Sequence, residues 1–347
     1  MTSLQTATNP APATGEESGT PADGDARRAR VDVHHHYTAP EWIDWAEKND
    51  IVRRGNLPPW TRWDVGSALA LMDGAGIRTS VLTVAMLGRL QEPKARKESA
   101  RVALQAASDL VRAHPDRFAF YTPVFLDSPE LSLWSVGHGM DELGAVGVSA
   151  RTSVRGVHLG HPSQDVLLAE LNERSAVIST HPMEVPGGDT ELDGVPPFVC
   201  DFLMDTTRAA LSLILNGTLD RYPKLTFILP HGGGFLPYIA SRVEVFSGHL
   251  TPKVEPARVR DYLHRFYYDT AGPMSPSATP SLLSAVGPSR ILYGSDWPPT
   301  PSHLVTGVTA PALDDDPALD AHQRRCINRD NAQRLLPALA AGGPRTS

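Results

Sequence analysis

The feature that most constrains the fold is an alternation of short β-branched or aromatic runs with longer amphipathic stretches, which begins near residue 30. In the longer stretches, apolar residues recur at three- and four-residue spacing, as they do on one face of a helix. Strands that alternate with helices predict a parallel sheet. The eight predicted strands are Val31–His36, Ser80–Val84, Phe118–Thr122, Val154–Leu159, Ala176–His181, Thr226–His231, Phe266–Thr270 and Arg290–Asp296. Eight repeats indicate an α/β protein, a (β/α)8 TIM barrel with long loops after its first and fifth strands.

The alternative architecture is an open, doubly wound sheet. Such a sheet usually carries a glycine-rich phosphate-binding turn after its first strand, whereas this chain has HHHYTAP there. Residues 1–29 contain almost no large apolar side chain, so they are predicted to be a disordered tail without the apolar segment of a secretory signal. Residues 30–340 are predicted to form a single barrel domain.

Composition excludes several classes of protein. No apolar run reaches the roughly 18 residues that span a bilayer, which argues against a membrane protein. Two cysteines, Cys200 and Cys326, cannot build a disulfide framework, and this agrees with a cytoplasmic location. A formal net charge of −7 argues against a nucleic-acid partner.

Histidine and aspartate stand at the ends of four of the predicted strands. The first strand ends in Asp-Val-His-His-His, and His34 and His36 project to the same side because alternate residues of a strand share a face. A single histidine at a strand end is most often a polar capping residue. The pair combined with His181, His231 and Asp296 favours a metal site instead, because active-site residues of a barrel gather at the carboxyl ends of its strands.

Three further histidines are interpreted as non-ligands: His35, His158 and His161. Of these, His158 lies near the end of the predicted fourth strand.

Aromatic residues are concentrated in the loop after the first strand. Four of the six tryptophans lie between Trp42 and Trp63, and they are interpreted either as an apolar lid over a flat substrate or as packing against the barrel rim. Trp60, Trp297 and Phe198 are predicted to contact the substrate. Residues Glu184–Pro197, rich in Gly and Pro, form a second candidate lid.

Taken together, these motifs resemble the amidohydrolase superfamily. The motifs are xDxHxH, THP, HGGG with an Arg further along the helix, and GSDWP, and the resemblance extends over about residues 30–337. The branch that the chain is most similar to is that of aminocarboxymuconate-semialdehyde decarboxylase. Within it, residues 201–242 look most like 6-methylsalicylate and other o-hydroxybenzoate decarboxylases.

The resemblance implies a role for each matching residue. His34, His36, His181 and Asp296 match the metal ligands of the family, and His231 matches its catalytic histidine. Arg242 matches an arginine that binds the substrate carboxylate, in some members across a dimer interface, so a homodimer is expected. The family also has an arginine in the loop after the first strand, and none of the arginines there is a clean match.

One absence bears on the number of metal ions. Many hydrolases of the superfamily bridge two metals with a carboxylated lysine at the end of strand four, and no lysine lies near that position here. A single divalent ion is therefore expected, most readily Zn²⁺, with Mn²⁺ as its competitor.

The reaction expected from the resemblance is non-oxidative decarboxylation of a small aromatic or conjugated carboxylic acid, with release of CO2. Asp296 is expected to deliver the proton to carbon, and His231 to position or deprotonate a metal-bound oxygen. The alternative is hydrolysis of a lactone or amide by metal-bound hydroxide, because the same ligand set permits both reactions.

Overall fold

The computed structural model describes residues 29–88, 90–183, 194–272 and 274–340. The predicted tail, residues 1–29, lies outside the described residues except for its last member, and so does most of the second candidate lid, Glu184–Pro197. Within the described part of the chain, no helix combines the length and the apolar character that a membrane crossing requires.

The described residues contain an eight-stranded sheet in which every neighbouring pair is parallel, in the order β1-β2-β3-β4-β7-β8-β9-β10. Its strands are β1 (Arg30–Tyr37), β2 (Ile77–Val84), β3 (Phe118–Pro123), β4 (Gly147–Arg151), β7 (Val177–His181), β8 (Thr226–Leu229), β9 (Phe266–Asp269) and β10 (Ile291–Leu292). The sheet closes where the segment after β10 reaches β1. There the amide of Val33 donates to Tyr293 O at 3.0 Å, and the amide of Asp296 donates to His34 O at 2.9 Å. The chain is therefore a (β/α)8 barrel, as its alternating pattern predicted.

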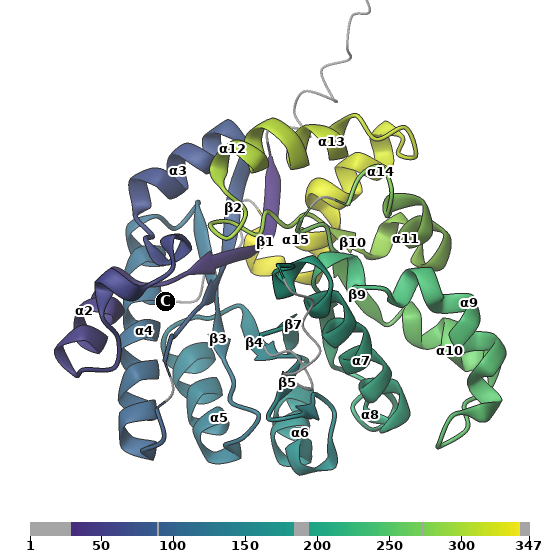
Figure 1. The fold of residues 1–347 in the computed structure, drawn as a ribbon, viewed down its shortest axis with the longest axis horizontal. Coiled ribbons are helices and arrows are strands. Elements are labelled where there is room, and N and C mark those ends of the chain that lie inside the picture. The colour runs from purple at the N-terminus through teal and green to yellow at the C-terminus, as the bar shows by residue number, and fades with distance from the viewer. Residues whose placement is uncertain (1–28, 89, 184–193, 273, 341–347) are drawn as a thin grey trace, which may run out of the picture.

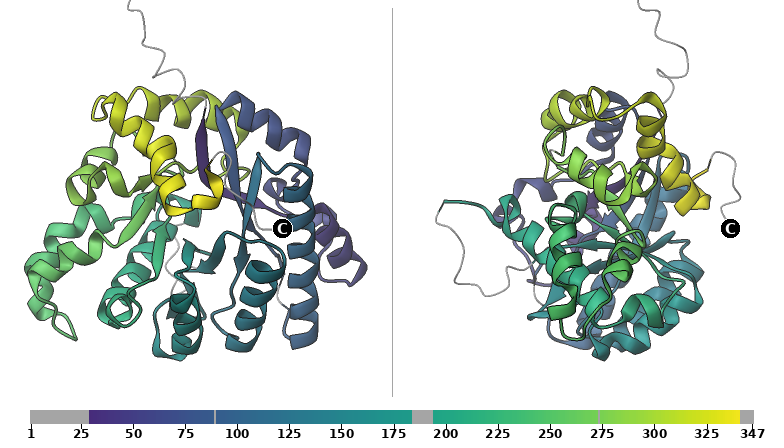
Figure 2. Two further views of the ribbon diagram at one scale, coloured as in Figure 1. Left: turned by 180° about the vertical axis from the view of Figure 1, so that it is seen from behind. Right: turned by 90° about the vertical axis from the view of Figure 1, so that its right-hand side faces the viewer.

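The helices lie outside the strands (Figures 1 and 2). They are α2 (Pro40–Lys48), α3 (Val65–Gly74), α4 (Pro93–Ala113), α5 (Pro129–Val136), α6 (Asp165–Glu173), α7 (Asp201–Leu215), α8 (Thr218–Arg221), α9 (Leu236–Phe246), α10 (Pro256–Leu263), α11 (Thr279–Val286), α12 (Ser302–Leu304), α13 (Ala310–Asp314), α14 (Ala321–Arg325) and α15 (Asn331–Leu335). Their apolar faces pack with one face of the strands into the main core, to which Leu104 of α4 and Leu213 of α7 belong. A second core cluster takes Val33, Val81 and Ile228 from the strands, together with Leu336 after α15.

The predicted fourth strand, Val154–Leu159, is wrong. The fourth strand of the barrel is β4, and the predicted segment instead forms a small antiparallel hairpin from β5 (Ser153–Val154) and β6 (Val157–His158). The first residue of β4 is Gly147, where a Cβ would lie 2.6 Å from the carbonyl oxygen of Val177 on β7. Only glycine fits this close approach without a shift of the backbone. Glycine has a low strand propensity, so the strand is inconspicuous in the sequence.

Strand β1 contains an irregularity that matters for the site. Its pairing with β2 shifts register between Asp32 and His35, so that two residues, Val33 and His34, stand opposite Val81 alone. Such a β-bulge reverses the alternation of faces along a strand. Val33 can thus belong to the inner core cluster while His34, the next residue, points into the mouth of the barrel with His36.

Candidate metal centre

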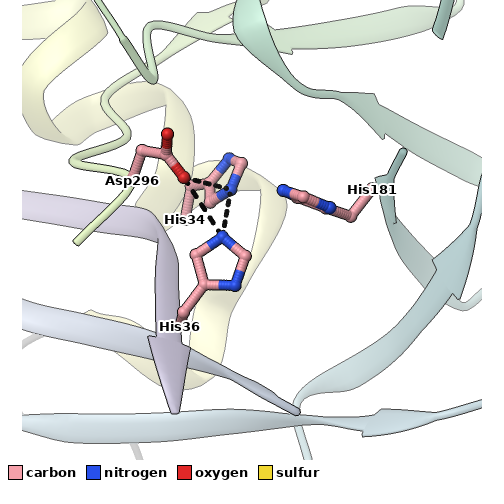
Figure 3. A group of neighbouring side chains, drawn as sticks. All are labelled: His34, His36, His181 and Asp296. Atoms are coloured by element: carbon pink, nitrogen blue, oxygen red, sulfur yellow. Dashed lines mark hydrogen bonds and ion pairs between the residues drawn. The ribbon is translucent and has the colours of Figure 1, made fainter. Parts of the chain in front are cut away.

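Four predicted ligands converge at the mouth of the barrel. One ligand atom from each of His34, His36, His181 and Asp296 lies within 4.8 Å of all the others (Figure 3). Oδ1 of Asp296 lies 3.1 Å from Nε2 of His36 and 3.3 Å from Nε2 of His34, and the two imidazole nitrogens lie 3.2 Å apart. The residues come from β1, from β7 and from the turn after β10, which are far apart in the sequence.

Strained backbone places two of the site residues. Asp296 has φ of 58° and His231 has φ of 54°, in the left-handed region that non-glycine residues seldom adopt. The glycines after His231 make its turn possible, since Gly234 also has a positive φ and a Cβ there would lie 2.2 Å from Leu203 O. His231 lies two residues beyond the end of β8. Its Nε2 lies 3.8 Å from Oδ2 of Asp296.

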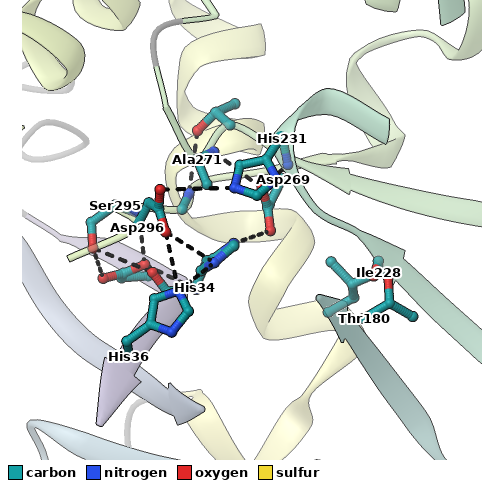
Figure 4. A network of polar contacts seen from close by, with 12 residues as sticks. His34, His36, Thr180, Ile228, His231, Asp269, Ala271, Ser295 and Asp296 are labelled. Atoms are coloured by element: carbon teal, nitrogen blue, oxygen red, sulfur yellow. Dashed lines mark hydrogen bonds and ion pairs between the residues drawn. The ribbon is translucent and has the colours of Figure 1, made fainter. Parts of the chain in front are cut away.

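Asp269, at the end of β9, links two of the site histidines. Its Oδ2 lies 2.8 Å from Nδ1 of His34, and its Oδ1 accepts from the amides of His231 at 2.9 Å and Ala271 at 3.1 Å (Figure 4). A carboxylate on the far nitrogen of a ligand histidine fixes its tautomer and orients the other nitrogen toward the metal. Asp269 was not among the predicted site residues, although it stands at the end of a predicted strand like the others.

Asp32 is a second buried carboxylate that the sequence analysis left without a role. It accepts hydrogen bonds from the amide of His34 at 3.0 Å, from the amide of Ser295 at 2.9 Å and from the Ser295 hydroxyl at 2.7 Å. It therefore holds the residue beside Asp296 against the strand that carries the histidine pair.

Electrostatics separate the cluster into charged and neutral members. Burial acts to raise the pKa of Asp296, but the neighbouring His231, His34 and His36 lower this pKa well below its usual range. Burial acts to lower the pKa of His34, but the carboxylates of Asp269 and Asp296 raise it well above its usual range. Burial and the adjacent imidazoles lower the pKa of His181 well below its usual range, so its neutral form is favoured.

The residues fit a divalent cation. Three imidazoles and one carboxylate form a donor set that suits a tetrahedral or more highly coordinated ion. Within the described residues, the buried Nδ1 atoms of His181 and His231 have no hydrogen-bond partner, and two imidazole Nε2 atoms face each other across 3.2 Å. The carboxylates of Asp269, which is buried, and of Asp296, which is partly buried, favour positive charge beside His34, and a divalent ion would supply that charge.

A cavity of about 1090 Å³ opens from the cluster. Its wall includes His36, His181, His231 and Asp296, and among the residues predicted to contact the substrate it includes Trp60 and Phe198. Phe198 lies in the short 3-10 helix Pro197–Val199 and is 65% exposed. Both side chains are therefore in position to contact a molecule that occupies the cavity.

Two other predicted substrate contacts lie elsewhere. Trp297 is not among the described residues of the cavity wall, because it is buried against His35, with ring centroids 4.9 Å apart, and donates to Ser302 Oγ. Its predicted place in the pocket wall is corrected accordingly. Arg242 on α9 is also absent from that wall, and its guanidinium lies over the ring of Phe246 at 5.1 Å.

The tryptophans after β1 divide between the two interpretations. Trp42 and Trp63 are buried in the main core, and Trp45 packs against it. Trp60 faces the cavity, with its ring centroid 6.3 Å from that of His36. Three of the four tryptophans thus pack in or against the core, as the second interpretation predicts. Trp60 is the one of these four that lines the described cavity and could contact a substrate.

The histidines interpreted as non-ligands are each bound elsewhere. His35 accepts a hydrogen bond from Nε1 of Trp63 at 3.3 Å, and His158 lies 3.1 Å from the buried carboxylate of Asp205. His161 accepts from the amide of Ser163. None of these three belongs to the metal cluster found among the described residues.

Comparison with known proteins adds independent information. A family model described as amidohydrolase matches residues 31–338. The decarboxylase macB of Penicillium terrestre is 30% identical over 80% of this chain and 86% of its own. The 6-methylsalicylic acid decarboxylase acuB of Aspergillus aculeatus is 28% identical over 89% of this chain and 96% of its own.

A solved structure shares the fold. It is that of a dihydroxybenzoic acid decarboxylase from Polaromonas sp. JS666 with bound manganese and an inhibitor, 2-nitroresorcinol. The two chains superpose with a TM-score of 0.74 at 22% identity, over 90% of this chain and 98% of the other.

Replacing the carboxylate behind His34 tests the centre without touching a ligand. We expect Asp269→Asn to weaken metal binding by about 10–100-fold, because His34 loses its charged acceptor. Calorimetric titration of the metal-free protein with Zn²⁺ and with Mn²⁺ measures the effect. The matched control is Asp220→Asn, which removes an exposed carboxylate that pairs with Arg258. Equal affinities in the wild type and Asp269→Asn would contradict the assigned role.

Proposed function

The chain belongs to the amidohydrolase family, and we propose that it is a metal-dependent, non-oxidative decarboxylase of a small aromatic or conjugated carboxylic acid. The proposed substrate is an o-hydroxybenzoate similar to 6-methylsalicylate, and CO2 is a product. One observation carries the proposal: the match to decarboxylases extends along nearly their whole length, up to 96% of one of them. The match therefore includes the barrel, the cluster and the cavity together.

The proposed ligands are His34, His36, His181 and Asp296, which hold one divalent ion. Bound there, the ion would polarise the carboxylate and the neighbouring oxygen of the substrate and fix the orientation of the bond that breaks. Three imidazoles favour Zn²⁺. Mn²⁺ is the alternative, supported by the manganese in the dihydroxybenzoic acid decarboxylase of the same fold.

A proton must reach the ring carbon that loses its carboxyl group. Asp296 divides its oxygens between two tasks: Oδ1 faces the imidazoles of the cluster, whereas Oδ2 lies 3.8 Å from His231 and 3.3 Å from the hydroxyl of Thr300. Its lowered pKa means that Asp296 is ionised at rest, so it must accept a proton before it can deliver one. We assign His231 as the group that takes a proton from an oxygen of the bound substrate and hands it to Asp296, which delivers it to carbon; the product oxygen then regains a proton from solvent.

The reaction itself is tested with a panel of substrates. We expect the metal-loaded protein to release CO2 from 6-methylsalicylate or 2,6-dihydroxybenzoate, with activity lost on chelation and restored by Zn²⁺ or Mn²⁺. An aminocarboxymuconate-type acid, a lactone and an amide complete the panel, and His34→Ala, prepared identically, is the control for the metal. Turnover confined to the lactone or the amide, without CO2, would identify a hydrolase instead.

The role of His231 predicts a specific loss. We expect His231→Asn to retain its metal and to reduce kcat by about 10²–10⁴-fold, the usual contribution of general acid–base catalysis. The control His303→Asn changes an exposed histidine on α12 that lies outside the described cavity wall. Elemental analysis beside the rate measurement separates loss of catalysis from loss of metal. Near-normal turnover in His231→Asn would exclude the assignment.

We propose a homodimer formed through α9, with Arg242 directed at the substrate carboxylate of the partner subunit. Tyr238, Val245 and Phe246 on this helix are 80%, 71% and 46% exposed, and they adjoin Arg242 at helical spacing. Exposed apolar residues grouped in this way are typical of an interface.

Sedimentation velocity measures the oligomeric state. We expect a dimer for the wild type and a monomer for the double variant Tyr238→Glu with Val245→Glu, because each change buries a charge at the interface. Val308→Glu, at an exposed apolar position in the helical turn Val305–Thr309 and therefore outside α9, is the control. A monomeric wild-type protein at micromolar concentration would refute the proposal.

A further inference from the structure

The metal cluster occupies only one arc of the barrel mouth. Its four members come from β1, β7 and the turn after β10, and the associated Asp269 and His231 come from β9 and from the turn after β8. Strands β2, β3 and β4 lie between β1 and β7 in the sheet (Figure 1). They supply no member of the cluster found among the described residues. The same cavity nevertheless extends over them, since its wall includes Thr83–Leu87, Pro123–Asp127 and Ser149–Arg151.

The far side of the cavity is mainly apolar. Met86 and Leu87 follow β2, Val124 and Leu126 follow β3, and Val154 lies in the hairpin after β4; all five belong to the described wall. All of them are wholly or partly buried and pack with the main core. We call this group of five the apolar shelf.

Three arginines line the cavity on the side of β2, β3 and β4. Arg96 pairs with Asp127 at 2.7 Å, and its guanidinium lies over the ring of Phe125 at 5.4 Å. Arg151 and Arg155 also line the cavity, but both are exposed, and Arg155 contacts Gln91 at 3.5 Å. The five side chains of the shelf thus present hydrocarbon, whereas Arg151 and Arg155 are exposed to solvent.

The cavity is far larger than one ring requires. A cavity of about 150 Å³ is enough to hold benzene. The volume here is about 1090 Å³ and is continuous from the metal cluster to the shelf. A hydroxybenzoate held at the cluster would leave the shelf facing water.

We propose that the shelf binds an uncharged apolar substituent on the aromatic acid, longer than a methyl group, while the carboxyl end lies at the metal cluster. The preferred substrate class is therefore a hydroxybenzoate with an alkyl side chain of several carbons. This inference rests on the proposed function, which places the reacting carboxyl group at the cluster.

Burial of the side chain sets the expected effect. Each methylene that moves from water onto the shelf is worth about 0.8 kcal/mol, which corresponds to an increase of about fourfold in kcat/KM. The increase stops when the chain reaches the exposed arginines. For salicylates substituted at the ring position of the methyl group in 6-methylsalicylate, we expect kcat/KM to rise from methyl through propyl to pentyl.

Two variants localise the effect. Met86→Trp fills the shelf, and Leu87→Glu places a charge on it, so both should remove most of the advantage of pentyl over methyl. Val308→Trp is the matched control, since Val308 is exposed on the helical turn before α13 and absent from the described cavity wall. Calorimetric binding of the same acids to the metal-loaded protein gives a readout that does not depend on turnover.

The outcomes separate this inference from the proposed function. Rates or affinities that rise with chain length, and that flatten in Met86→Trp and Leu87→Glu but not in Val308→Trp, support the shelf. A flat or falling series for the wild type overturns it even if CO2 is released. Preference for a substituent that ends in a carboxylate over an alkyl chain of equal length also overturns it, in favour of recognition by the arginines. Absence of CO2 with every acid refutes the proposed function, and the calorimetric series still decides whether the shelf binds alkyl chains.

Discussion

The seam between β1 and the segment after β10 is the constraint on which the rest of the structure depends. Three backbone hydrogen bonds cross it, from Val33 to Tyr293, from Asp296 to His34 and from His36 to Trp297. Two of them use ligand residues directly, and Asp32 adds further bonds from β1 to Ser295. The contacts that close the barrel are therefore the contacts that bring the carboxylate of Asp296 to the histidine pair.

Much of the fold and of the candidate site could be predicted from the sequence, because both follow from local rules. Seven of the eight predicted strands coincide with barrel strands, and the four proposed ligands lie together, since the carboxyl ends of parallel strands meet at one mouth. The fourth strand was missed because β4 opens with Gly147, where close approach to Val177 matters more than propensity. The fourth strand was thus predicted several residues too late, but the predicted alternation of strands and helices is correct.

The errors within the site have a common origin. Asp269 was overlooked because its role depends on a bond to His34, 235 residues away, which no local pattern records. Trp297 was placed in the pocket because it adjoins Asp296, yet the positive φ of Asp296 turns the chain, and the indole packs on His35. The bulge in β1 is likewise invisible in the sequence, although the predicted pairing of His34 with His36 on one face holds. Where the backbone departs from regular helix or strand geometry, the position of a residue in the sequence does not predict where its side chain points.

The mouth of the barrel divides into an arc that carries the four proposed ligands and an arc that carries the apolar shelf. Loops after β2 and β3 can change the shape of the cavity without disturbing any residue of the cluster, since none of the four ligands lies on those strands. In the proposed enzyme, specificity would therefore be carried by loops outside the metal cluster.

The seam also determines at which stage of synthesis and folding the proposed metal site can form. His34 and Asp296 are 262 positions apart, so a ribosome-bound chain that lacks its last barrel strand has the histidine pair but not the carboxylate. A complete site exists only in the closed barrel, and a ligand that binds only the folded state stabilises that state by mass action. The metal would therefore bind only after the barrel has closed, and its binding would stabilise the closed barrel against unfolding.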